Sequence, residues 1–211
     1  MVDQVIVSWF DVQRTWSHLE SIFIGSEDIR KQLPVDSQRF DDIDTEFKKL
    51  MITMAKTPNV VVATNVDGLA EQLEGIQSQL SLCEKALAEY LETKRLAFPR
   101  FYFASSNDLL DILSNGNQPI KVSKHLTKLF DSMAKLHLKE KETKKDKWKP
   151  QEKMDALMPQ SITDPERLSN NAYAMSSKDG EYVLFNKDCV CEGQVEVWLN
   201  KLMATMRASI R

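Results

Sequence analysis

The chain has 211 residues, and its 28 Lys and Arg against 31 Asp and Glu give a formal net charge of −3. This near-neutral balance argues against a surface that coats nucleic acid, and the longest apolar run, Val60–Ala63, is far shorter than the roughly 18–20 residues of a membrane span. Three cysteines are too few for a disulfide framework, and the few glycines and prolines disfavour an all-β fold. We therefore expect a cytosolic, mainly α chain, an elongated helical bundle with one β-hairpin.

Three apolar stripes predict three amphipathic helices, because their residues alternate by three and four positions and so share a helical face. The stripes cover residues 2–23, 40–54 and 69–90. Trp9 and Trp16 on the first stripe favour a broad bundle over a two-stranded coiled coil. We expect Gly25 to stop this helix in a conformation with positive φ. The third helix, counted from residue 67 to 94, predicts a rod of about 40 Å at 1.5 Å per residue.

A dense aromatic run, Phe98-Pro99-Arg100-Phe101-Tyr102-Phe103, follows the third stripe. Because a proline disfavours helical geometry in the residue before it, we expect an extended connector whose rings are mostly buried between two helices. Ser105, with Asp108 three residues later, resembles a capping box that opens a short helix.

The last third of the chain changes character. A helix is predicted by apolar residues that include Leu129, Met133 and Leu136. We expect residues 1–138 to form the helical part and the lysine-rich residues 139–171 to form an exposed insertion. A β-hairpin followed by a helix then occupies residues 172–211, and both chain ends are expected to continue into a longer protein.

The hairpin prediction rests on Asp179-Gly180 between the segments 173–178 and 181–185, because Asp-Gly favours a tight type I′ turn. Its pattern predicts two apolar faces, one of which rests on the chain's own helices while the other meets a neighbour. Tyr173, Met175, Tyr182 and Leu184 are expected on one face, and Val183 with Phe185 on the other.

Residues that could form a catalytic site are scarce. The sequence contains no G-x-x-x-x-G-K-[ST] phosphate loop, and its six glycines lie far apart. Cys189 and Cys191 form a C-x-C pair, which does not match the usual zinc spacing, and Cys83 lies on an apolar stripe as a core residue. We interpret His125 and His137 as surface or edge residues. We expect no catalytic, cofactor-binding or metal-binding residue here.

Several blocks resemble the dynein heavy chains in the order in which that family has them. They are DVQRTW at 11–16, DIRKQLP at 28–34, YLETKRLAFPRFYF at 90–103 and GQVEVWL at 193–199. In that family they belong to the C-terminal half of the linker, the helical lever that precedes the ring of AAA+ ATPase modules. Their sequences are closer to those of axonemal dyneins of the outer-arm β type than to those of cytoplasmic dyneins. The segment 139–171 is longer than the corresponding segment expected in the family.

The resemblance implies a mechanical role, in which the linker bends and straightens as the ring changes nucleotide state. It implies that ATP and Mg bind in the parent motor's ring and not in this segment, which is then no enzyme by itself. The implied partners are the AAA+ ring of the same heavy chain and, for the parent, microtubules and other dynein heavy, intermediate and light chains, with no nucleic acid or membrane. The implied location is the cytoplasm and cytoskeleton, in the axoneme of cilia and flagella.

The residues that we expect to serve structural or docking roles are Trp16, Phe98, Pro99, Arg100, Phe101, Phe103, Asp179, Gly180 and Trp198. Two other hypotheses stay open at this point. One is a free-standing helical scaffold or adaptor without a motor. The other is a thiol or histidine enzyme that uses Cys83 or Cys189, which a rapidly alkylated cysteine of low pKa would indicate.

Overall fold

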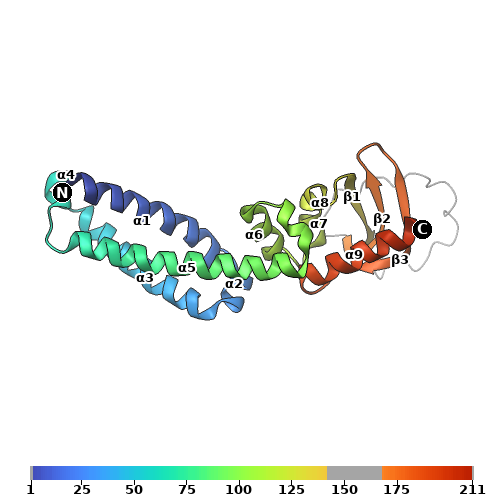
Figure 1. Cartoon of the computed structure of the whole chain (residues 1–211), viewed down its shortest axis with the longest axis horizontal. Coiled ribbons are helices and arrows are strands. Elements are labelled where there is room, and N and C mark those ends of the chain that lie inside the picture. The colour runs from blue at the N-terminus through green and yellow to red at the C-terminus, as the bar shows by residue number, and fades with distance from the viewer. Residues whose placement is uncertain (1, 142–167, 211) are drawn as a thin grey trace. The chain divides into compact units, whose positions relative to one another are not determined.

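Helices dominate the chain, and a small antiparallel sheet accompanies them (Figure 1). The computed structural model describes residues 2–141 and 168–210. The chain divides into two compact units, residues 1–94 and 95–211. The prediction of a mainly α fold with one hairpin is confirmed.

The first unit is built from helices whose buried residues are those of the predicted stripes. Its elements are α1 (Val2–Phe23), α2 (Glu27–Gln32), α3 (Pro34–Met54), α4 (Val60–Thr64) and the greater part of α5 (Leu69–Ala97). The apolar periodicity therefore located α1, α3 and α5 correctly, because each of these helices has a single apolar face to bury.

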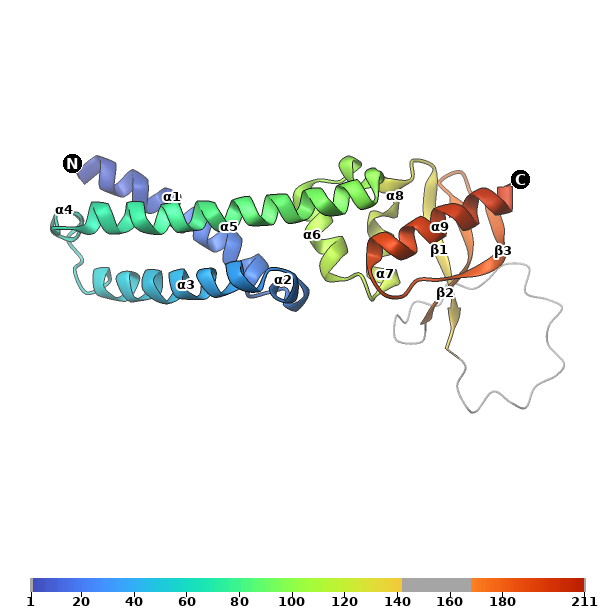
Figure 2. The same cartoon turned by 60° about the horizontal axis from the view of Figure 1, so that its bottom comes forward.

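Ring and side-chain contacts show how the long helices of the first unit pair. Phe23 of α1 stacks on Phe40 of α3, with ring centroids 5.4 Å apart. The amide of Gln72 on α5 donates to the carboxylate of Glu46 on α3 at 3.1 Å, and the two helices lie side by side in Figure 2. The core of this unit is the set of apolar faces between α1, α3 and α5.

Gly25 follows α1, but its φ is not positive, so the predicted mechanism is wrong. A side chain is excluded there for a different reason. A Cβ atom at Gly25 would lie 2.3 Å from the carbonyl oxygen of Ser21, a distance at which the two atoms overlap. Close approach of two backbone segments, rather than left-handed geometry, requires glycine here.

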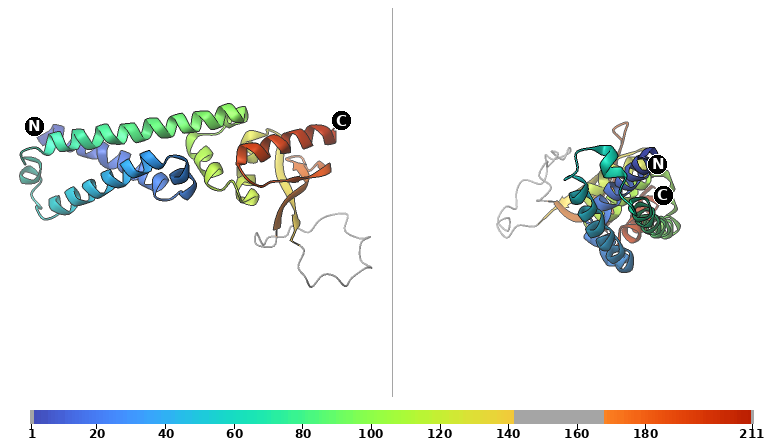
Figure 3. Two further views of the ribbon diagram at one scale, coloured as in Figure 1. Left: turned by 90° about the horizontal axis from the view of Figure 1, so that it is seen from below. Right: turned by 90° about the vertical axis from the view of Figure 1, so that its left-hand side faces the viewer.

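The second unit combines short helices, a three-stranded sheet and one longer helix. Its elements are η1 (Pro99–Phe103), α6 (Ser106–Ser114), α7 (Pro119–Val122), η2 (Ser123–His125), α8 (Leu126–Leu129), β1 (Met133–Glu140), β2 (Leu168–Ser177), β3 (Tyr182–Val190) and α9 (Val195–Ile210). The strand order is β1-β2-β3, and both pairs are antiparallel. α9 packs beside β3 (Figure 3), where the Ser209 hydroxyl accepts the amide N–H of Asn186 at 3.0 Å.

The helix predicted through Met133 and Leu136 is wrong, because α8 ends at Leu129 and strand β1 begins at Met133. The segment MAKLHLKE also alternates apolar and polar residues, which is the pattern of a strand. Pairing with β2 decides between the two patterns. Residues 142–167 of the predicted insertion lie outside the described residues, and the residues at its two ends belong to β1 and β2.

The predicted hairpin is present, but its turn and register differ from the prediction. Among the four loop residues 178–181, only Gly180 has positive φ, at 86°, whereas a type I′ turn needs positive φ at two residues. Met175 consequently pairs with Val183 and shares its face. A one-residue change of register moves a side chain to the other face of the sheet, which explains why Met175 is buried.

Candidate functional site

The aromatic run of residues 98–103 begins with the predicted extended residue and then forms a 3-10 helix. Phe98 has φ −139° and ψ 92°, and Pro99 occupies the first position of η1, where its fixed φ suits a helical turn. Phe98 and Phe101 are 1% and 0% exposed, and their rings meet edge to face with centroids 5.0 Å apart. This pair anchors the segment in the core of the second unit.

The other aromatic side chains of the run face outward, so the prediction that its rings are mostly buried is wrong for them. Tyr102 is 54% exposed and Phe103 is 72% exposed, and nearby Leu96 on α5 is 68% exposed. A 3-10 helix has three residues per turn, so Phe98 and Phe101 share one face while the two following residues lie off it. We name Leu96, Tyr102 and Phe103 the outward triad.

The Arg100 side chain makes structural contacts within the second unit. One guanidinium nitrogen donates to the carbonyl oxygen of Leu129 at 2.8 Å, and the guanidinium carbon lies 4.9 Å from the centroid of the Phe130 ring. These contacts tie η1 to the end of α8. The side chain is therefore engaged within the second unit.

The two tryptophans among the expected residues connect elements that are far apart in sequence. The indole N–H of Trp16 donates to Asp44 at 3.1 Å and thereby links α1 to α3. Trp198 on α9 is fully buried, and its indole N–H donates to the carbonyl oxygen of Gly116 at 3.0 Å. Buried tryptophans usually find such an acceptor, so both positions are packing sites. Asp179 and Gly180 form the hairpin turn described above.

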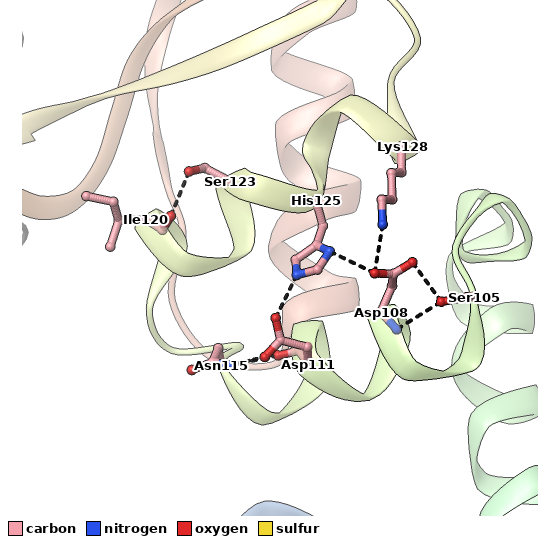
Figure 4. A network of polar contacts seen from close by, with 8 residues as sticks. All are labelled: Ser105, Asp108, Asp111, Asn115, Ile120, Ser123, His125 and Lys128. Carbon is pink, nitrogen blue, oxygen red and sulfur yellow. Dashed lines mark hydrogen bonds and ion pairs between the residues drawn. The ribbon is translucent and has the colours of Figure 1, made fainter.

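A polar network that the sequence did not predict joins α6 to η2 and α8 (Figure 4). Nε2 of His125 lies 2.7 Å from an Asp111 carboxylate oxygen, and Nδ1 lies 3.5 Å from an Asp108 oxygen. The ammonium of Lys128 lies 2.8 Å from the same Asp108 oxygen. His125 lies half-buried at the edge of the core, with its side chain 14% exposed.

The capping box explains half of this network. Ser105 accepts the amide N–H of Asp108 at 3.2 Å and donates its hydroxyl to the Asp108 carboxylate at 2.7 Å, as the sequence predicted. The partners His125 and Lys128 come from 17 and 20 residues further along the chain, a separation at which no local pattern marks them. The arrangement lacks a nucleophile beside the imidazole, and it holds short helices together.

Acid should weaken this network through Asp108. The hydrogen bonds from Lys128 and from Ser105 lower the pKa of Asp108 from 3.8 to about 2. The folded state therefore binds fewer protons than the unfolded state between these values, so the free energy of unfolding should fall as the pH drops from about 4 to about 2. Carboxyl NMR titration should show Asp108 near 2 and, in Lys128→Met, clearly nearer to 3.8.

Lys124→Met is the matched control, because Lys124 is an exposed lysine of the preceding turn. That variant should leave the Asp108 titration unchanged. An Asp108 carboxyl that titrates at the same pH in both variants would contradict the assigned role of Lys128.

Within the described residues, no group of three or more His, Cys, Asp or Glu side chains could hold a metal ion. Each unit has a groove among its described residues. The first, about 380 Å³, lies between α1, α3 and α4, and the second, about 600 Å³, lies between the sheet and the end of α9. No histidine or cysteine lines either groove. Over the part of the chain that the structure covers, no helix has the length and apolar character to cross a membrane.

The geometry of the site does not identify a protein family, but comparison with known proteins does. Residues 1–211 match the family described as "Dynein heavy chain, N-terminal region 2". The chain is 60% identical over 209 residues to the "Dynein beta chain, ciliary" of Heliocidaris crassispina, and 56% identical to human "Dynein axonemal heavy chain 17". It is 46% identical over 210 residues to the "Dynein beta chain, flagellar outer arm" of Chlamydomonas reinhardtii. Each alignment covers at least 99% of this chain and 4% of the relative.

Proposed function

Because this chain belongs to the dynein heavy chain family, we propose that its 211 residues are a mechanical segment of the linker of an axonemal motor. The identity to ciliary and flagellar outer-arm chains supports this proposal. The parent motor then moves on microtubules in the axoneme with other dynein subunits. ATP and Mg bind in its AAA+ ring, outside these residues.

The construction of α5 supports a lever role. This helix has 29 residues, which corresponds to about 44 Å at 1.5 Å per residue. Its buried residues begin at Leu69 and recur to Leu91, so most of its length is packed on neighbouring helices. An isolated helix is marginally stable in water, whereas an apolar face packed along the whole length keeps it formed. A lever needs this property, because bending along its length would absorb displacement.

The single observation that carries the proposal beyond family membership is the outward triad. Leu96, Tyr102 and Phe103 are large apolar side chains, each more than half exposed within a stretch of eight residues. A contiguous exposed apolar patch marks an interaction surface, and these three residues are close neighbours along the chain. The buried pair Phe98 and Phe101 fixes the backbone that presents them. We assign the triad to contact with the AAA+ ring of the same heavy chain.

The outward face of the hairpin is a second candidate surface. Tyr182 is 41% exposed and Leu184 is 63% exposed, while Val183 and Phe185 between and beside them are less exposed. One face therefore rests on the chain's own elements, and the other is open to a neighbour within the motor.

The test uses a recombinant motor that carries the double substitution Leu96→Ser and Phe103→Ser. We expect microtubule gliding to slow at least about fivefold, because ring closure would no longer be coupled to the linker, while microtubule affinity stays unchanged. In the 211-residue chain the same substitutions should change the free energy of unfolding by no more than about 0.5 kcal/mol each, as is usual for exposed sites.

Val35→Ser with Ile52→Ser is the matched control, since these residues of α3 are 69% and 62% exposed and lie outside the triad. This control motor should glide at the wild-type speed. Equal speeds for the triad variant and the control would overturn the docking role and leave the family assignment intact.

A further inference from the structure

Two buried cysteines lie together at the end of β3, and the lever role uses neither of them. Cys189 pairs with Ala172 of β2. Cys191 follows the strand, and its amide N–H donates to the carbonyl oxygen of Asn170 at 2.8 Å. Both are free thiols, 3% and 0% exposed.

The two thiols interact with each other and with α9. The Cys191 thiol donates to the carbonyl oxygen of Cys189 at 3.6 Å. On α9 the Thr205 hydroxyl donates to the carbonyl oxygen of Lys201 at 3.0 Å, and Lys201 adds a positive charge near Cys189. These neighbours lower the pKa of Cys189 against the opposite effect of its burial, and the Cys189 sulfur raises the pKa of Cys191. Of the two thiols, Cys189 is therefore the one that ionises first, while Cys191 keeps its proton.

The spacing of the pair suits an intrachain disulfide. Residues two positions apart in an extended chain have Cα atoms about 6.6 Å apart at 3.3 Å per residue. Disulfides bridge Cα separations of about 4.4–6.8 Å. Side chains two positions apart also point to the same side of a strand. A disulfide needs Cβ atoms about 3.5–4.5 Å apart, so closure requires residues 189–191 to leave the extended conformation at the strand end.

We propose that Cys189 and Cys191 form a redox modification site that reacts with low-molecular-weight disulfides and closes to an intrachain disulfide. The Cys189 thiolate attacks one sulfur of oxidised glutathione, whose S–S bond breaks and releases one glutathione thiolate. Cys191 then loses its proton to that thiolate, attacks the Cys189 sulfur and displaces the second glutathione. Two protein thiols are oxidised and one glutathione disulfide is reduced to two thiols.

Oxidised glutathione reaches the buried pair through a local opening of the chain. Residues 192–194, which connect Cys191 to α9, are all exposed, and Gly193 turns the chain there with φ of 83°. Short exposed segments open at lower free energy than a packed core. Cys83, in contrast, is 0% exposed in the middle of α5, and burial raises its pKa. Cys83 therefore serves as the internal standard in the experiment below, because only large-scale unfolding exposes its thiol.

The experiment incubates the 211-residue chain with oxidised glutathione under native conditions, alkylates the remaining thiols and analyses tryptic peptides by mass spectrometry. Cys189 and Cys191 share one peptide, since no Lys or Arg lies between them. We expect that peptide to lose two hydrogen atoms at least about tenfold faster than Cys83 reacts. In Cys191→Ser, oxidation should stop at a mixed disulfide on Cys189.

Two results would overturn the proposal. One is a common reaction rate for all three cysteines, which would mean that unfolding of the chain limits each. The other is glutathione retained on Cys189 in the wild-type chain, which would mean that the pair does not close. Circular dichroism of Cys191→Ser establishes that the variant is folded before its reaction is interpreted.

Discussion

Replacing Phe101 by alanine should lower the free energy of unfolding by about 3–5 kcal/mol, the range for a buried phenylalanine. The side chain is 0% exposed and meets Phe98 edge to face, so the substitution removes apolar contacts and leaves a cavity. Urea unfolding of the second unit measures the loss. Phe101→Leu, which keeps most of the apolar volume, should lose clearly less and provides a value if the alanine variant fails to fold.

Phe103→Ala is the matched control for this prediction, because its ring belongs to the same 3-10 helix and is 72% exposed. It should change the free energy of unfolding by no more than about 0.5 kcal/mol. Similar losses at the two positions would contradict the division of the run into a buried pair and an outward triad.

Replacing Trp198 by alanine should lower the free energy of unfolding by at least about 3–5 kcal/mol. The indole is fully buried and donates to the carbonyl oxygen of Gly116, 82 residues away. Its removal leaves both a cavity and a buried acceptor without its donor, and the second effect alone costs about 1–3 kcal/mol. Urea unfolding again measures the loss. The loss in Trp198→Ala should exceed the loss in Trp198→Phe.

Trp198→Phe reduces the cavity contribution, because it keeps an aromatic ring in the core while it loses the indole N–H and a smaller part of the ring volume. We expect it to cost about 1–3 kcal/mol. Val197→Ala, at the neighbouring position that is 44% exposed, should cost much less than either. A Trp198→Ala loss below about 1 kcal/mol would show that α9 is not anchored through this ring.

The proposed redox site and the anchoring tryptophan lie at the two ends of one connection. Cys191 directly follows β3, and Trp198 fixes the first turns of α9. Oxidation of the cysteine pair would therefore constrain the junction between sheet and helix.

The sequence by itself determined the long helices, the capping box at Ser105 and the existence of the hairpin. Each depends on residues within a few positions of one another: the spacing of apolar residues along α1, α3 and α5, the pair Ser105 and Asp108, and Asp179-Gly180 between two apolar segments. Local physical chemistry is sufficient for these features, since neither distant pairing nor burial by another element is needed to define them.

Tertiary structure alone decided the features that depend on distant partners. Leu129, Met133 and Leu136 fit a helical spacing, yet residues 133–140 form a strand because β2 supplies the hydrogen bonds of a ladder. His125 is bound between two carboxylates that only the packing of α6 on η2 brings to it. The face on which Met175 lies depends on the four-residue connection between β2 and β3, since a shift of one residue in register moves every side chain of a strand to the other face. The alternative conformations at these positions differ little in local free energy, so contacts with residues distant in sequence determine which one forms.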